Sequence, residues 1–193
     1  MQPYLAASPY INFDHPAVAA QAAALAEGAG ADPLDVVKRC FEFVRDEIKH
    51  SVDFKLNPVT CKASDVLQHR TGYCYAKSHL LAALLRANGI PTGLCYQRLS
   101  VGDQGAPYCL HGLNAVYLPQ FGWYRIDARG NKPGVNAQFT PPHEALAFAL
   151  HDPMERDLPE IWAEPLPLVI QALHAHDDVA QVLRNLPDVP LLG

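Results

Sequence analysis

The stretch HRTGYCYAKSHLLAALLRANGIPTG, residues 69–93, places a cysteine at the start of a long apolar run. The run favours a helix from about residue 73 to residue 88. Thr71 is a suitable N-terminal cap, and Gly72 would let the backbone turn sharply and approach a neighbour closely. Cys74 would then lie in the first turn of this helix.

The far end of the same helix is also well marked. Gly89 suits a left-handed C-terminal cap, Ile90 the apolar contact that accompanies such a cap, and Pro91 the stop that follows it. Leucines occupy a broad face of the helix, at positions 80, 81, 84 and 85. We therefore expect this helix to be central and buried.

A cysteine in a first helical turn has two interpretations. Partial positive charge at a helix N-terminus favours the thiolate, which is the nucleophilic form, and the unpaired N–H groups there can bind an oxyanion. Free cysteine is also among the most buried residue types and often only fills a core. Cys74 alone does not decide between these interpretations.

Helices are expected on the N-terminal side of this segment. An Ala-rich helix opens near Asp14 and Pro16 and stops at Gly28. In a second helix Asp32 can cap the N-terminus and Pro33 takes the first helical position. A short helical turn is expected further along the chain, from Ser64. The second helix is amphipathic, with apolar residues at alternating steps of three and four: Leu34, Val37, Phe41, Val44 and Ile48.

After residue 91 the sequence period changes to that of strands. TGLCYQRL, HGLNAVYL and GWYRID (92–99, 111–118 and 122–127) are short, contain β-branched and aromatic residues, and are separated by turn residues. They predict an antiparallel meander. Helices followed by a run of strands indicate an α+β fold, with helices on one side of an antiparallel sheet.

The length of 193 residues suits a single domain. We expect its core over about 32–130 and a C-terminal segment of short helical pieces over about 141–186. The last piece, over 165–185, is expected as one helix or as two broken near Asp177. The loop over 130–142 follows the last predicted strand, and we expect it to border a cleft.

His111 opens one predicted strand and Asp127 ends the next. A tight hairpin between them would bring the two residues within one or two positions of each other, on the same face of the sheet. A carboxylate beside a histidine fixes its tautomer and stabilises the imidazolium, which in turn stabilises a thiolate. Separately, His111 could be an ordinary solvated histidine, and Asp127 could pair with Arg125 or Arg129.

Together these motifs resemble the core of the transglutaminase-like superfamily. That family has Gly-x-Cys at a helix start, Leu-Arg-x-x-Gly-Ile-Pro at the helix end, a strand opening with His, and a strand ending in Trp-x-x-x-Asp. The corresponding residues here are Gly72, Cys74, Leu85, Arg86, Gly89, Ile90, Pro91, His111, Trp123 and Asp127.

The resemblance implies a papain-like α+β fold and acyl transfer through a Cys-His-Asp triad. Cys74 would attack an amide or ester carbonyl, His111 would move the proton, and Asp127 would orient His111. The superfamily includes cross-linking enzymes, proteases, peptide deglycosylases and members without activity, so it implies a reaction type rather than a substrate. Tyr73, Tyr75 and Trp123 are expected to contact the substrate.

The chain departs from the family pattern at one position. Cross-linking members use an upstream Trp, and papain-like proteases an upstream Gln, as the second oxyanion donor. Both tryptophans here lie downstream of Cys74. The upstream alternatives are His50, Asn57, Thr60 and Gln68, and the sequence does not choose among them. There is also no room for the calcium-binding insertions of large cross-linking enzymes, so hydrolysis of a small amide or peptide is the favoured activity.

Composition limits the partners. The net charge of −5 and the scattered basic residues give no reason to expect nucleic acid, and no apolar run reaches the roughly 20 residues of a membrane span. The first residues lack the pattern of a secretory signal, and the five cysteines show no CxxC pair, which predicts free thiols in the cytoplasm. The expected partner is a peptide, protein or small amide substrate, with no cofactor and no metal; the oligomeric state stays open.

Three alternatives remain. The domain could bind a peptide or protein without turnover, which the missing oxyanion side chain favours. It could be an amine-accepting transglutaminase or acyltransferase, including an acetyltransferase that uses acetyl-coenzyme A. Cys109 and His111, with Cys61 or Cys95, could hold zinc, although the paired ligand spacing typical of such sites is missing.

Overall fold

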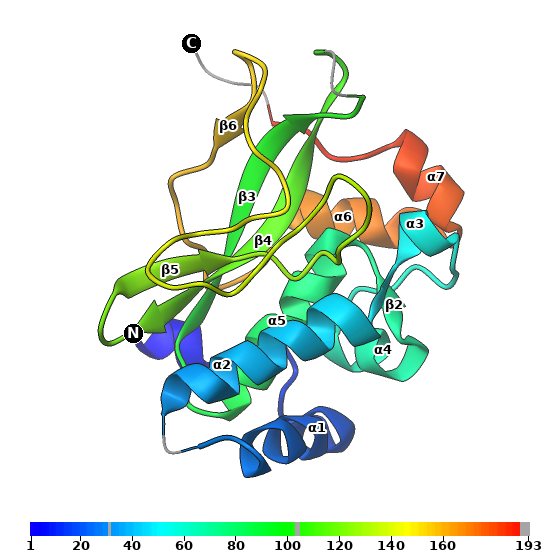
Figure 1. The fold of residues 1–193 in the computed structure, drawn as a ribbon. Helices are drawn as coiled ribbons and strands as arrows, with labels where there is room; N and C mark the ends of the chain where they lie inside the picture. Colours follow the sequence, from blue (N-terminus) through cyan, green and yellow to red (C-terminus); the bar gives the residue numbers. More distant parts are fainter. Residues whose placement is uncertain (31, 103–104, 190–193) are drawn as a thin grey trace.

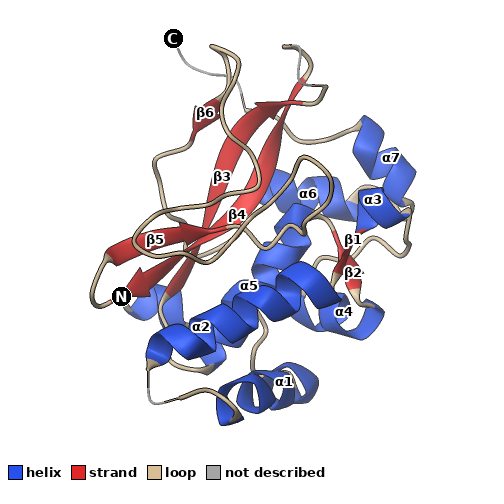
Figure 2. Ribbon diagram, viewed as in Figure 1, coloured by secondary structure: helices blue, strands red, loops and turns tan. Residues whose placement is uncertain are grey.

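Helix α5 (Cys74–Ala87) lies at the centre of the fold, between a four-stranded antiparallel sheet and the N-terminal helices (Figure 1). The computed structural model describes residues 1–30, 32–102 and 105–189. Every residue of α5 except Ala87 is buried, which confirms the predicted central helix. The four-stranded sheet lies apart from most of the helices, as expected for the α+β class, whereas a second sheet of two short strands lies among the helices (Figure 2).

The C-terminal end of α5 is closed as its sequence predicts. Gly89 has a φ of 71°, in the left-handed region that favours glycine. The N–H of Gly89 donates to the Arg86 carbonyl at 2.9 Å, and that of Ile90 to the Leu85 carbonyl at 3.0 Å. These bonds satisfy carbonyls that lack partners inside the helix.

The N-terminal end differs from the prediction. Tyr73 occupies the cap position without a side-chain hydrogen bond, so Thr71 is not the cap. Thr71 instead lies in β2 (Thr71–Gly72), which pairs in parallel with β1 (Lys49–His50), and its hydroxyl donates to the Lys49 carbonyl at 3.1 Å. Gly72 provides space rather than a turn, because an added Cβ would lie 3.2 Å from the Ala76 Cβ.

The helices before β1 follow the sequence signals. After the short 3-10 helix η1 (Gln2–Leu5), α1 spans Pro16–Glu27 and α2 spans Pro33–Glu42, and the Asp32 side chain accepts from the Leu34 N–H at 3.0 Å. The predicted amphipathic helix continues as the π-helical turn η2 (Phe43–Glu47) before the chain extends into β1. The short helices α3 (Ser51–Phe54) and α4 (Ala63–His69) lead on to β2.

The sheet has the order β5-β4-β3-β6. Its strands are β3 (Thr92–Ser100), β4 (Tyr108–Leu118), β5 (Gly122–Ile126) and β6 (Arg156–Asp157). Asn114 pairs with Ile126 and Tyr117 with Trp123 across the hairpin, so the predicted meander is confirmed. The two-residue strand β6 is too short to leave a periodic signal in the sequence.

The C-terminal prediction is only partly correct. Two helices form, α6 (Pro167–His174) and α7 (Val179–Arg184), and Asp178 caps the second by accepting from the Ala180 N–H at 2.7 Å. Residues 141–166 contain β6 and loops rather than helix. Their prolines, at positions 141, 142, 153, 159 and 165, explain the difference, because proline disfavours the helical conformation in the residue before it. In the part of the chain that is described, no helix is long and apolar enough to cross a membrane.

Helix α5 begins in direct contact with β4 at Gly112. A Cβ at Gly112 would lie 3.1 Å from the Tyr75 Cα and 3.3 Å from the Tyr75 nitrogen. Both are backbone atoms that cannot move without moving the helix. The missing side chain therefore sets the distance between the first turn of α5 and the sheet.

We predict that Gly112→Ala pushes the first turn of α5 away from β4. Overpacking of this kind typically costs about 1–3 kcal/mol of the free energy of unfolding. Denaturant unfolding should report this loss, whereas Gly102→Ala, at a glycine with open space around it, should leave stability unchanged. Equal stability of the two variants would show that the contact at Gly112 is not limiting.

Candidate active site

Cys74 is the first residue of α5 and lines a cavity of about 960 Å³. The side chain is buried apart from this side, with the whole residue 8% exposed. Its Sγ accepts a hydrogen bond from the Gly112 N–H at 3.4 Å. The contact between α5 and β4 thus holds the sulfur in one place at a helix N-terminus.

His111 and Asp127 are in direct contact beside this sulfur. His111 Nε2 lies 2.7 Å from Asp127 Oδ2. The same carboxylate accepts from the backbone N–H groups of Arg129 and Ala147, each at 3.1 Å, so it is fixed from three directions. Because Nε2 is engaged, Nδ1 is the ring nitrogen left for proton transfer on the cavity side.

The charges of these groups are coupled. Burial disfavours the charged ring, but the Asp127 carboxylate and the Cys74 sulfur outweigh it and raise the pKa of His111 to about 10. Burial acts to raise the pKa of Asp127, and the nearby His111 outweighs it, so that this pKa is lowered. At neutral pH the pair is therefore an imidazolium and a carboxylate.

The other cysteines have a different environment. Burial raises the pKa of each of their thiols to about 12, namely those of Cys40, Cys61, Cys95 and Cys109. Cys40 is fully buried in the core. Cys109 lines the same cavity as Cys74, which makes it a natural comparison for thiol reactivity.

An ion cluster of Asp53, Arg129 and Lys132 also borders the cavity. Asp53 accepts from Arg129 Nη2 at 3.0 Å and from Lys132 Nζ at 2.8 Å. Although burial acts to raise it, these two cations hold the pKa of Asp53 well below its ordinary value. Arg129 also lies 5.6 Å from the centre of the Phe148 ring, and that ring meets His111 edge to face at 5.0 Å.

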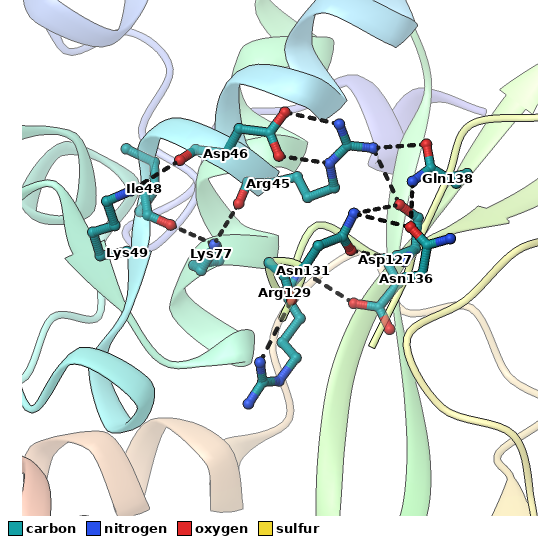
Figure 3. A network of polar contacts seen from close by, with 12 residues as sticks. Arg45, Asp46, Ile48, Lys49, Lys77, Asp127, Arg129, Asn131, Asn136 and Gln138 are labelled. Atoms are coloured by element: carbon teal, nitrogen blue, oxygen red, sulfur yellow. Dashed lines mark hydrogen bonds and ion pairs between the residues drawn. The ribbon is translucent and has the colours of Figure 1, made fainter. Parts of the chain in front are cut away.

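The loop over 130–142 borders the cavity as predicted, through Lys132, Val135 and Asn136 among others. Hydrogen bonds tie this loop to η2, and Figure 3 shows the network. Arg45 donates to the Ala137 carbonyl at 3.1 Å, and the Ala137 N–H donates to Asn131 Oδ1 at 2.8 Å.

Lys77 joins the same network from α5. Its Nζ donates to the carbonyls of Ile48 and Arg45, at 2.5 Å and 3.4 Å. Burial lowers the pKa of Lys77 to about 7. The bonds fix the end of η2 against the helix that carries Cys74.

Of the three residues expected to contact the substrate, two line the cavity and one does not. Tyr73 and Tyr75 line the cavity, but both are almost fully buried, and their hydroxyls donate to the carbonyls of Val179 and Leu110. Trp123 is not among the described residues that line the cavity; its ring packs against Tyr4 and Tyr117. Trp123 lies four residues before Asp127, which is roughly 13 Å along the strand at about 3.3 Å per residue. This distance is too great for Trp123 to reach the cavity beside Asp127.

The sequence did not single out Asp53, Phe148 or Glu155, which also line the cavity. Glu155 accepts from the backbone N–H groups of Ser100, His151 and Asp152, at 2.6 to 3.1 Å. The bond from Ser100 joins residues 55 positions apart, and no local pattern marks such a contact. Within the described residues, no three His, Cys, Asp or Glu side chains lie together as they would to hold a metal ion.

A cysteine at a helix N-terminus beside a histidine–carboxylate pair is the arrangement of a cysteine-type catalytic domain. The model of the transglutaminase-like superfamily matches residues 20–128, and the chain belongs to that superfamily. A comparison with curated proteins finds no match.

Comparison with solved structures gives several matches, of which the first below shares the fold. One is described as a candidate cysteine protease from Cytophaga hutchinsonii, with a TM-score of 0.53 and 21% identity; the match covers 66% of this chain and 41% of that one. Another is the periplasmic domain of TgpA from Pseudomonas aeruginosa, with a TM-score of 0.47 and 23% identity over 65% of this chain and 45% of that one. The chain therefore matches less than half of either protein.

The pKa of His111 predicts a pH profile. If protonated His111 supplies a proton to the leaving group, acyl transfer should decline as the pH rises through about 10. Asp127→Asn removes the charge that stabilises the imidazolium, so this alkaline limb should move to lower pH, toward the ordinary histidine pKa of about 6.5. The measurement is kcat/KM against pH for both proteins, with circular dichroism as the folding control. An alkaline limb that stays in place would contradict the coupling.

The ion cluster predicts a charge preference. Arg129 and Lys132 share one carboxylate, which leaves one positive charge in excess at this edge of the cavity. Lys132→Glu should lower kcat/KM several-fold for acidic substrates relative to basic ones. Lys38→Glu, an exposed substitution outside the cavity, is the matched control. The same relative preference in both variants would show that Lys132 does not face the substrate.

Proposed function

We propose that this protein is a cysteine-dependent acyl-transfer enzyme that hydrolyses an amide or peptide substrate. The supporting observation is the meeting of Cys74 with the His111–Asp127 pair at one cavity. Helix α5 supplies the nucleophile, and the β4–β5 hairpin with the residue that follows it supplies the base and its orienting group.

In the first half of the reaction the Cys74 thiolate attacks the substrate carbonyl carbon. A C–S bond forms, and the carbonyl π electrons move to the oxygen, which becomes an oxyanion. The Cys74 N–H is one of the first N–H groups of α5, which have no partner within the helix, and it can donate to that oxygen. As the intermediate collapses, His111 gives its proton to the departing amine and the C–N bond breaks.

In the second half, water attacks the thioester. His111, now neutral, takes a proton from the water, and the sulfur leaves as a thiolate. Asp127 stabilises the imidazolium that forms, and its bonds to the backbone at residues 129 and 147 keep it in place. The enzyme returns to its starting charge state.

The shape and lining of the cavity support a peptide or amide substrate. Its volume of about 960 Å³ is at the upper end of the range for sites that hold drug-sized molecules, roughly 300–1,000 Å³. Apolar side chains cover part of the wall, and the charged side chains of Asp53, Arg129 and Lys132 line another part. These apolar residues include Leu99, Leu110, Leu146, Phe148 and Leu186.

The test is labelling by a panel of electrophilic amides, read by intact mass and peptide mapping. Wild type should form a covalent adduct at Cys74 and release the amine, whereas Cys74→Ala should lose acyl transfer by about 10³-fold or more. Cys109→Ser removes the neighbouring thiol and should keep the activity. His111→Ala should slow alkylation of Cys74 by iodoacetamide, because the thiolate loses its cationic partner.

Two outcomes would contradict the proposal. Cys74 could react with iodoacetamide no faster than Cys109, which would show that its environment does not activate it. Wild type and Cys74→Ala could also turn over every amide equally slowly. Either result would favour a domain that binds a peptide or protein without turnover.

A further inference from the structure

His50 is fixed next to the start of the helix that carries Cys74. In the parallel pair of β1 and β2, His50 lies opposite Gly72, two residues before the cysteine. Its ring meets the ring of Tyr73 edge to face at 5.8 Å. The position of His50 relative to the first turn of α5 is therefore set by backbone pairing and by an aromatic contact.

The side chain of His50 is buried but not satisfied. The residue is 6% exposed, and its Nδ1 has no hydrogen-bond partner. The carboxylate oxygen of Asp53 lies 3.9 Å from Nδ1, which is too far for a hydrogen bond. Nδ1 therefore faces the protein interior on the Asp53 side.

His50 also borders the cavity. Four buried side-chain atoms in the described part of the chain lack a partner: those of His50, His79, Gln97 and Asn114. Of these residues only His50 lines the cavity, together with Cys74 and His111. Because Nδ1 is enclosed, a group that enters the cavity would meet the His50 ring through Nε2.

The other three upstream alternatives for an oxyanion donor are occupied or lie elsewhere. Asn57 donates to Asp178 at 3.2 Å and accepts from the Val179 N–H at 2.9 Å. The Thr60 hydroxyl donates to the Thr71 carbonyl at 2.9 Å, and Gln68 is exposed on α4. None of the three lines the cavity.

We propose that His50 donates an N–H hydrogen bond to the carbonyl oxygen of the substrate as that oxygen becomes negative. With the Cys74 N–H it would form a two-donor site. This inference rests on the proposed function, because the oxyanion exists only if Cys74 attacks a carbonyl. His50 gives up no proton; the bond strengthens as the C–S bond forms and negative charge collects on the oxygen.

The electrostatic surroundings suit this role. Burial and the charge of Arg129 hold the pKa of His50 well below its ordinary value; Asp53 opposes them, and Lys77 and His111 add to them. The ring is therefore neutral at pH 7 and carries one N–H. A neutral imidazole can stabilise an oxyanion without adding a second cation beside His111.

The experiment measures the burst of p-nitrophenol that p-nitrophenyl acetate releases as it acylates Cys74. His50→Ala should acylate about 10²–10³-fold more slowly than wild type, the typical loss for one oxyanion donor. His50→Gln keeps an N–H donor of similar reach and should recover most of that loss. His69→Ala, an exposed histidine outside the cavity, is the matched control and should acylate as wild type does.

Alkylation by iodoacetamide separates this role from a structural one. Displacement of iodide builds no charge on an oxygen, so Cys74 of His50→Ala should alkylate at the wild-type rate. A parallel fall in acylation and alkylation would overturn the proposal, because it would show that His50 only shapes the site. So would a loss confined to deacylation, which would place His50 on the attacking water.

The two proposals fail in different ways. Wild type that acylates normally, with His50→Ala acylating equally fast, would overturn the role of His50 and leave the proposed function intact. Wild type that forms no acyl-enzyme with this ester or with the amide panel would overturn the proposed function, and the role of His50 with it.

Discussion

The close approach of α5 to β4 is the constraint on which the rest of the site depends. Cys74 lies on the helix and His111 on the strand, so their separation is set where the two elements touch. At that contact Gly112 has no side chain, the Tyr75 backbone packs against it, and the Gly112 N–H reaches the Cys74 sulfur. Cys74 and His111 are thus positioned by packing between rigid elements, which holds geometry more tightly than loops do.

Burying these charged groups is costly, and the surrounding backbone reduces that cost. Asp127 is almost fully buried, yet two backbone N–H groups and His111 satisfy its oxygens. Asp53, which is not fully buried, is paired with Arg129 and Lys132. A buried carboxylate with this many donors stays ionised, so the cavity keeps a fixed charge pattern around neutral pH.

Much of this arrangement could be predicted from the sequence because its signals are local. The Gly89 cap, the apolar face of α5 and the hairpin that unites His111 with Asp127 each depend on residues within a short stretch. The pairing of β1 with β2 left no signal in the sequence, since each strand has only two residues. Because Thr71 belongs to this pair and its hydroxyl donates to Lys49, it does not cap α5 as predicted. The ion pair of Asp53 with Arg129 joins residues 76 positions apart and has no periodic pattern.

The division between rigid elements and loops also bears on specificity. Cys74, His111 and His50 belong to a helix and to paired strands, whereas Lys132, Val135 and Asn136 belong to a loop tied down by side-chain and backbone hydrogen bonds. Substitutions in that loop can alter the wall of the cavity without moving the sulfur or the imidazole. A fold built in this way can keep one reaction and change its substrate, which is why membership of the superfamily indicates chemistry better than it indicates substrate.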